Sequence, residues 1–244
     1  MSNKNKIISS IRKNIENYWN EYNRIEFNPD NPRINLHEPT FGPDEVMAML
    51  EVMLSTRVTM GPKVIGFERE IADYFNVSEV ITNNSGSSAN LLAIAALTNP
   101  STKNGLKPGD EVIVPALSWS TTVWPLIQHN LIPVFVDIDP ETLNIDPEAI
   151  KDAVTENTKA IMIVPVYGNP CDMDSIMEIC DDFNLQLIED NCESLGAYYD
   201  GKLLGSFGRV GTYSTYFSHH ITTLEGGICI SNDFELFVVI SVAI

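Results

Sequence analysis

The chain has 244 residues, 44% of them hydrophobic, which is enough for one large α/β domain or two small domains with a sizeable core. It carries 15 Lys and Arg residues against 33 Asp and Glu residues, a formal net charge of −18 at pH 7 that argues against nucleic acid or an anionic membrane as the main partner. No apolar run reaches the roughly 20 residues of a membrane-spanning helix, and the polar N-terminus lacks the apolar core of a signal peptide, so we expect a cytoplasmic protein.

The N-terminal part is predicted to hold two helices joined by a linker. The apolar positions of the first helix are Ile7, Ile8, Ile11, Ile15 and Trp19. Residues 28–33 are rich in Pro and Asn, which favours a linker, and residues 43–54 have apolar side chains at helical spacing. We therefore expect an N-terminal helix and linker over residues 1–32, followed by the main domain over residues 33–236.

From residue 63 onward, short apolar strands alternate with helices. Helices are predicted at 63–75, 87–97, 121–129, 147–154 and 174–183. Strands are predicted at 80–82, 111–115, 132–136, 158–164 and 186–188, and near 211–215 and 227–231. This alternation indicates an α/β protein with three layers, α/β/α, in which helices cover both faces of a mostly parallel sheet. Residues 237–244 break the pattern as an almost unbroken apolar run, which we treat as an aberrant tail.

A pair of histidines stands in the stretch 213–227. Ser214 is followed five residues later by His219, and His220 comes next. An imidazole has a pKa near neutrality and can act as a base. Two histidines beside an aromatic run can also be packed or exposed residues without a chemical role.

Small residues open the helix predicted at 87–97. Gly86, Ser87 and Ser88 follow a strand, and a helix N-terminus with small residues offers free N–H groups and a positive dipole end to a phosphate. A serine-rich helix cap without a ligand is the alternative. Trp119 follows the strand predicted at 111–115, and Asp190 ends the strand that contains 186–188. Both therefore lie at the carboxyl edge, where α/β sheets bind ligands.

The segments 84–90, 187–190 and 213–227 together resemble the DegT/DnrJ/EryC1/StrS sugar aminotransferase family, whose members have the type I fold of pyridoxal-phosphate-dependent transferases. In that family a lysine that binds the cofactor covalently stands five positions after a serine, and His219 occupies that position here. This replacement is typical of the nucleotide-sugar 3-dehydratase branch. The resemblance covers residues from about 33 to 235.

The resemblance implies pyridoxal 5′-phosphate or pyridoxamine 5′-phosphate, held without a covalent bond, and it assigns a role to each site residue. The cofactor phosphate would lie at Gly86, Ser87, Ser88 and Ser214. Trp119 would stack on the ring, Asp190 would hold the pyridine nitrogen protonated, and Glu193 would lie near the phenolic oxygen or the substrate. His219 would be the catalytic base, with His220 as the alternative.

The implied reaction is dehydration at C3 of a nucleotide-activated 4-keto-6-deoxyhexose, in deoxysugar and lipopolysaccharide biosynthesis, by a homodimer. Whether the nucleotide is CDP or GDP, and whether a reductase is a partner, stays open.

The four cysteines show no C-x-x-C pairing and are expected to be free thiols. Cys192 matches a ligand of the [2Fe-2S] cluster found in some dehydratases, or it is a small buried residue; no other metal site is predicted.

Two alternatives remain. A sugar aminotransferase would need a lysine in the loop, and none lies between Lys202 and the end of the chain. A non-catalytic fragment is the alternative from another class, because members of the family continue into a small C-terminal domain that is missing here. We therefore expect a C-terminally truncated chain.

Overall fold

The computed structural model describes residues 3–23, 27–33 and 41–243. Its contacts divide the chain into two compact units, Met1–Ile65 and Gly66–Ile244. The first unit contains α1 (Asn3–Tyr22) and α2 (Pro43–Ser55), which contact each other and share an ion pair between Arg12 and Asp44. Both helices predicted in this part of the sequence are confirmed.

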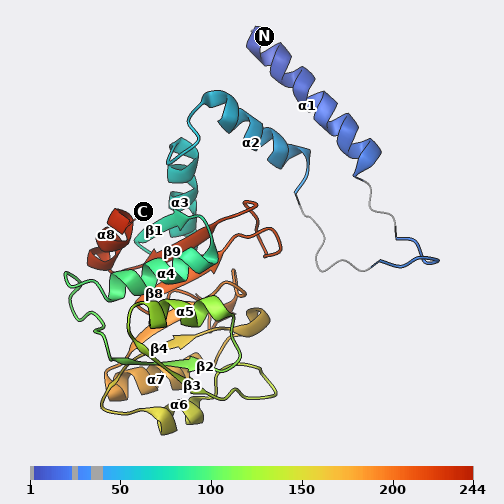
Figure 1. Ribbon diagram of the computed structural model, residues 1–244. Helices are drawn as coiled ribbons and strands as arrows, with labels where there is room; N and C mark the ends of the chain where they lie inside the picture. The colour runs from blue at the N-terminus through green and yellow to red at the C-terminus, as the bar shows by residue number, and fades with distance from the viewer. Residues whose placement is uncertain (1–2, 24–26, 34–40, 244) are drawn as a thin grey trace. The chain divides into compact units, whose positions relative to one another are not determined.

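The second unit is built on a seven-stranded sheet with the strand order β1-β9-β8-β5-β4-β2-β3 (Figure 1). The strands are β1 (Glu79–Asn83), β2 (Glu111–Pro115), β3 (Ile132–Val136), β4 (Thr158–Ile163), β5 (Gln186–Asp190), β8 (Val210–Ser214) and β9 (Gly227–Ser231). Only β9 is antiparallel to its neighbours, and all other neighbours in the sheet are parallel. The predicted α/β fold with a mostly parallel sheet is confirmed.

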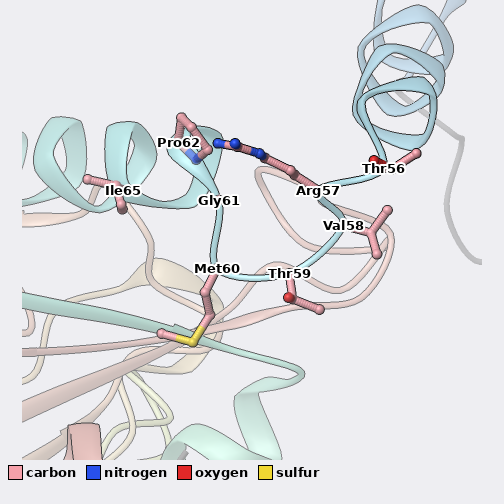
Figure 2. A pocket seen from close by; sticks show the side chains of 8 residues that line it. All are labelled: Thr56, Arg57, Val58, Thr59, Met60, Gly61, Pro62 and Ile65. Atoms are coloured by element: carbon pink, nitrogen blue, oxygen red, sulfur yellow. The ribbon is translucent and has the colours of Figure 1, made fainter.

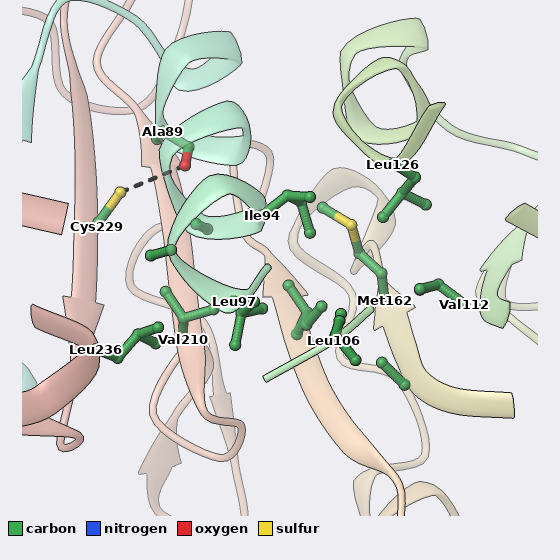
Figure 3. Close-up of a cluster of buried hydrophobic side chains, with 14 of the residues drawn as sticks. Ala89, Ile94, Leu97, Leu106, Val112, Leu126, Met162, Val210, Cys229 and Leu236 are labelled. Carbon is green, nitrogen blue, oxygen red and sulfur yellow. Dashed lines mark hydrogen bonds between the residues drawn. The ribbon is translucent and has the colours of Figure 1, made fainter. Parts of the chain in front are cut away.

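Helices cover both faces of this sheet. One face packs against α4 (Gly86–Leu97), α5 (Ser120–Gln128) and α8 (Phe234–Ala243), where side chains such as Ile94, Leu126 and Met162 form a buried cluster (Figure 3). On the other face lie α6 (Pro147–Ala153), α7 (Met173–Phe183) and the second part of α3 (Pro62–Phe75). Alternate residues of each strand enter the two cores, which gives the predicted three layers.

The apolar run at the end of the chain forms a helix. Leu236 and Ile240 are buried in the core beside α4, whereas Phe234 and Val242 are 63% and 83% exposed. Most of the predicted aberrant tail, residues 237–244, thus lies in α8. The domain boundaries predicted from the sequence, 1–32, 33–236 and 237–244, stay a prediction.

Two short elements near the carboxyl edge were not predicted. A hairpin of β6 (Tyr198–Tyr199) and β7 (Lys202–Leu203) follows β5, and a 3-10 turn at Val166–Gly168 follows β4. Tyr167 in that turn has a left-handed backbone, with φ 54°. In the described ranges we find no helix with both the length and the apolar character needed to cross a membrane.

Candidate active site

The candidate site lies at the carboxyl edge of the sheet. β5 ends at Asp190, β8 ends at Ser214, and α4 begins at Gly86 shortly after β1. In open α/β sheets, ligands bind outside the carboxyl ends of the strands. The fold therefore brings three of the predicted cofactor segments to one edge.

The first turn of α4 has the features of an anion site. Ser85 is the N-cap residue, and its Oγ accepts the N–H of Ser88 at 3.1 Å. The exposed Ser87 donates from its Oγ to Thr121 Oγ1 of α5 at 3.1 Å. Because the N–H groups of a first turn have no partner inside the helix, this end of α4 suits a phosphate. The predicted position of Gly86, Ser87 and Ser88 at a helix start is confirmed.

Gly86 lies in close contact with two other predicted site residues. A Cβ at position 86 would lie 2.6 Å from Ser214 Cβ and 2.7 Å from Cys192 Sγ. Real Cβ atoms do not approach other atoms so closely, so this point of the fold requires glycine. The contact fixes the start of α4 against the end of β8.

Asp190 is 3% exposed and makes three hydrogen bonds inside the protein. Its Oδ2 accepts from Asn90 Nδ2 and from Thr122 Oγ1, both at 2.7 Å, and its Oδ1 accepts the N–H of Cys192 at 3.3 Å. Within the described ranges no Lys, Arg or His forms an ion pair with it. A buried carboxylate without a cation is costly, so this environment favours a cationic ligand.

The two histidines lie in the loop that connects β8 to β9. Thr215 and Thr223 close the base of this loop: the N–H of Thr223 donates to Thr215 O at 2.9 Å, and their Oγ1 atoms are 2.7 Å apart. The N–H of Thr215 donates to Gly226 O at 2.9 Å, and the N–H of His219 donates to Tyr216 O at 3.0 Å. The loop is therefore held by backbone and threonine hydrogen bonds.

His219 is half-buried and His220 is exposed. Burial lowers the pKa of His219 below its usual value, and the neighbouring His220 lowers it further. The carboxylates of Glu193 and Asp190 act in the opposite direction on the same pKa, so His219 is close enough to both to feel their charge. The structure thus distinguishes the two histidines by burial, with His219 the more buried of the two.

Glu193 accepts the N–H of Tyr167 on its Oε2 at 3.1 Å. Tyr167 is 81% exposed, and its left-handed backbone is supported by Asn144, whose Oδ1 accepts the N–H of Val166 at 3.0 Å. Asn144 also donates from Nδ2 to the carbonyl of Asn169 at 3.0 Å. This turn after β4 therefore fixes Glu193 at the carboxyl edge.

Trp119 and Cys192 differ in their exposure. Trp119 is the N-cap residue of α5 and is 72% exposed, so it is not a core residue. Cys192 is half-buried beside Gly86, and burial raises its thiol pKa well above the usual value, which favours the protonated thiol. The described residues contain no cluster of three or more His, Cys, Asp or Glu that could hold a metal ion.

Four residues at or beside the site had no role predicted from the sequence. Asn90, Thr122 and Thr212 surround Asp190, and each is almost fully buried. Glu189 is fully buried on the opposite face of β5, where it accepts the N–H groups of Gly205 at 2.5 Å, Phe207 at 2.8 Å and Gly208 at 2.6 Å. Burial raises the pKa of Glu189 to about 7, although these N–H groups act to lower it. The sequence feature that could have indicated these four residues is that each is a polar residue within an otherwise apolar segment.

A separate cavity of about 510 Å³ lies in the first unit, around the segment between α2 and α3 (Figure 2). It is lined by Thr56, Arg57, Val58, Thr59, Met60, Gly61, Pro62 and Ile65. None of the predicted site residues lines it. Arg57 is its charged lining residue.

Comparison with known proteins identifies the family of the chain. The model of the DegT/DnrJ/EryC1/StrS aminotransferase family matches residues 39–242. The chain is 48% identical over 202 residues to a GDP-4-keto-6-deoxy-D-mannose 3-dehydratase of Yersinia pseudotuberculosis, covering 83% of this chain and 51% of that protein. It is 41% identical over 234 residues to a dTDP-4-dehydro-2,6-dideoxy-D-glucose 3-dehydratase of Saccharopolyspora spinosa, covering 96% and 50%.

A solved structure shows the same fold. The Escherichia coli GDP-4-keto-6-deoxy-D-mannose-3-dehydratase with bound hydrated pyridoxal phosphate superposes with a TM-score of 0.82 at 45% identity. The match covers 86% of this chain and 54% of that one. The chain thus spans about half the length of the relatives that it matches. The predicted type I fold is confirmed.

Proposed function

Because the chain belongs to the DegT/DnrJ/EryC1/StrS aminotransferase family, we propose that it acts in the dehydration at C3 of a nucleotide-activated 4-keto-6-deoxyhexose. Relatives named as 3-dehydratases of GDP- and dTDP-linked sugars support this reaction class. The greater identity to the GDP-sugar enzyme than to the dTDP-sugar enzyme favours a GDP-linked substrate. The chain spans about half the length of these relatives. The proposed activity is therefore that of the whole protein, as a homodimer, to which this chain contributes the site described above.

The residues present fit pyridoxal or pyridoxamine 5′-phosphate. Asp190 is a buried carboxylate without a cationic partner in the described ranges, as a protonated pyridine nitrogen requires. Gly86 allows the start of α4, with the free N–H groups of its first turn, to lie against Ser214. When bound, the cofactor supplies an electron sink for the carbanion character that develops as a C–H bond breaks.

His219 carries the proposal. It occupies the position where the family has its lysine, and no lysine follows Lys202 in the chain, so covalent attachment of the cofactor in this loop is excluded. Burial lowers the pKa of His219, which leaves the imidazole neutral and able to accept a proton near pH 7. His219 takes the proton whose loss precedes departure of the C3 hydroxyl, and it is in a position to return a proton to the leaving oxygen.

The remaining site residues bind and orient. Ser87, Ser88 and Ser214 donate to the cofactor phosphate together with the N–H groups of the first turn of α4. The exposed indole of Trp119 stacks on the ring, and Glu193, fixed by the N–H of Tyr167, holds the phenolic oxygen or the substrate. Cys192 has no assigned step, and a [2Fe-2S] cluster or a reductase partner is not needed for these roles.

A binding and turnover experiment tests the proposal. The protein is titrated with pyridoxal phosphate by absorbance and then dialysed, and it is separately incubated with pyridoxamine phosphate and GDP-4-keto-6-deoxymannose while the product is followed by mass spectrometry. We expect reversible cofactor binding and loss of water from the sugar. A protein that does not bind the cofactor contradicts the proposal, and one that transfers an amino group without losing water points to a sugar aminotransferase.

A further inference from the structure

The two carboxylate oxygens of Asp190 have different surroundings. Oδ2 accepts two short hydrogen bonds of 2.7 Å, from Asn90 and from Thr122. Oδ1 accepts the N–H of Cys192 at 3.3 Å, a longer bond, and the Cys192 thiol is also hydrogen-bonded to this carboxylate. A carboxylate oxygen has about two good acceptor sites, so Oδ2 has both filled by strong donors, whereas the long bond to Oδ1 leaves that oxygen able to accept a stronger one.

The amide of Asn90 is oriented by a second hydrogen bond. Thr212 Oγ1 lies 2.5 Å from Asn90 Oδ1 and donates to it, and its distance to the alternative acceptor, Glu189 O, is 3.4 Å. An amide that accepts from Thr212 through its oxygen must present its NH₂ group to Asp190. The reverse orientation would direct the amide oxygen at a carboxylate, so the hydrogen-bond pattern itself selects the observed one.

These side chains come from four different elements and are all buried. Asn90 lies on α4, Thr122 on α5, Thr212 on β8 and Asp190 on β5, and each is at most 3% exposed. Hydrogen bonds that are donated to a buried carboxylate stabilise its charged form and are stronger than bonds between neutral groups. Loss of one donor therefore weakens the orientation of Asp190 and its interaction with a cationic partner.

We infer that Thr122, Asn90 and Thr212 are positioning residues, which orient Asp190 and leave Oδ1 as the oxygen for a ring N–H of the cofactor. This inference rests on the proposed function. Thr122 and Asn90 act directly on Asp190, and Thr212 acts through Asn90. Without these donors the Asp190 carboxylate would be oriented less firmly toward a ring N–H of the cofactor, and it would stabilise the protonated ring less.

The test uses isosteric variants and two measurements on the protein with pyridoxal phosphate. In Thr122→Val and Thr212→Val, we expect the Kd to rise about tenfold, which corresponds to about 1.4 kcal/mol, and the pH midpoint of the cofactor's absorbance change to fall. Thr122→Ser and Thr212→Ser keep the hydroxyl and should restore both values. In an Asn90→Ala background, Thr212→Val should change the Kd by less than about twofold, because the connection to Asp190 is already lost.

Thr158→Val is the matched control. Thr158 is 2% exposed and its hydroxyl bonds Glu111 at 3.1 Å, so the variant loses a buried threonine hydroxyl outside the site. We expect it to lower the melting temperature without changing the Kd or the absorbance midpoint. If Thr122→Val and Thr212→Val behave like this control while Asp190→Asn weakens binding, the inference is wrong and the proposed function stands. If wild type and Asp190→Asn bind the cofactor equally, the proposed function fails, and the inference fails with it.

Discussion

Gly86, the first residue of α4, contacts Ser214, the last residue of β8, so closely that a Cβ at position 86 would lie 2.6 Å from the Ser214 Cβ. Two segments separated by more than half of the chain thus meet at a single point. The backbone at neither residue can shift easily, because Gly86 begins a helix and Ser214 lies in the sheet. This contact gives the first prediction.

Gly86→Ala should lower the free energy of unfolding by about 1–3 kcal/mol, the usual cost of overpacking, and it should weaken binding of pyridoxal phosphate. Denaturant titration and absorbance titration measure the two effects. Gly66→Ala in α3 is the matched control, because no atom lies within 4 Å of its added Cβ. The control should stabilise the protein by about 0.5–1 kcal/mol, as expected for replacing glycine in a helix. Equal effects of the two variants would contradict the close contact.

His219→Asn should leave cofactor affinity and the melting temperature nearly unchanged while slowing dehydration by roughly 10² to 10⁴, the usual contribution of a positioned base. The rate is measured in a single turnover with pyridoxamine phosphate and sugar substrate. His220→Asn should cost less, because His220 is exposed whereas His219 is half-buried. If His220→Asn is the damaging change, the base is His220.

His219→Lys should permit a covalent bond to pyridoxal phosphate at residue 219, because a primary amine then occupies the loop position that the family uses. Borohydride reduction followed by peptide mass spectrometry should find a stable adduct at this residue and none in wild type. A wild-type adduct on any lysine of the folded chain would show that the cofactor is not held as proposed. Partial aminotransferase activity is expected in the variant.

Glu189 should make stability depend on pH between about 4.5 and 7. Burial raises its pKa from 4.5 to about 7, so the folded protein binds this proton more tightly than the unfolded chain does. The stabilisation of the folded state by protonated Glu189 is fully present below pH 4.5 and is lost as the pH rises to about 7. Over this range the free energy of unfolding falls by up to about 1.4 kcal/mol per pH unit. Urea denaturation at pH 5, 6, 7 and 8 measures it. Glu189→Gln should remove this slope, and the exposed Glu156→Gln should retain it.

The sequence allowed the fold and the positions of the site residues to be predicted to a large degree. Strand and helix alternation predicted the parallel sheet, and strand ends predicted that Trp119 and Asp190 lie at its carboxyl edge. Both predictions depend on local patterns and on the general rule for α/β sheets. The roles of the site residues stay predictions.

The supporting contacts were not predictable, because they join distant residues. Thr212 and Asn90 are 122 positions apart, and nothing in either local segment indicates the hydrogen bond between them. The left-handed backbone of Tyr167 and the N–H groups that Glu189 accepts also depend on tertiary structure. The apolar run 237–244 was interpreted as aberrant because its pattern is not amphipathic, yet Leu236 and Ile240 place one side of α8 in the core.

The single antiparallel strand, β9, has an evolutionary consequence. Since β9 returns directly alongside β8, both ends of the histidine loop are anchored by the sheet, and the side chain at residue 219 makes none of the hydrogen bonds that close the loop base. A mutation at this codon can therefore change the side chain at residue 219 while the protein still folds. In a lineage with this loop, the folding of the domain would place little constraint on substitutions at residue 219. Divergence between aminotransferases and dehydratases would then depend mainly on the chemistry of the new side chain and on the supply of substrate.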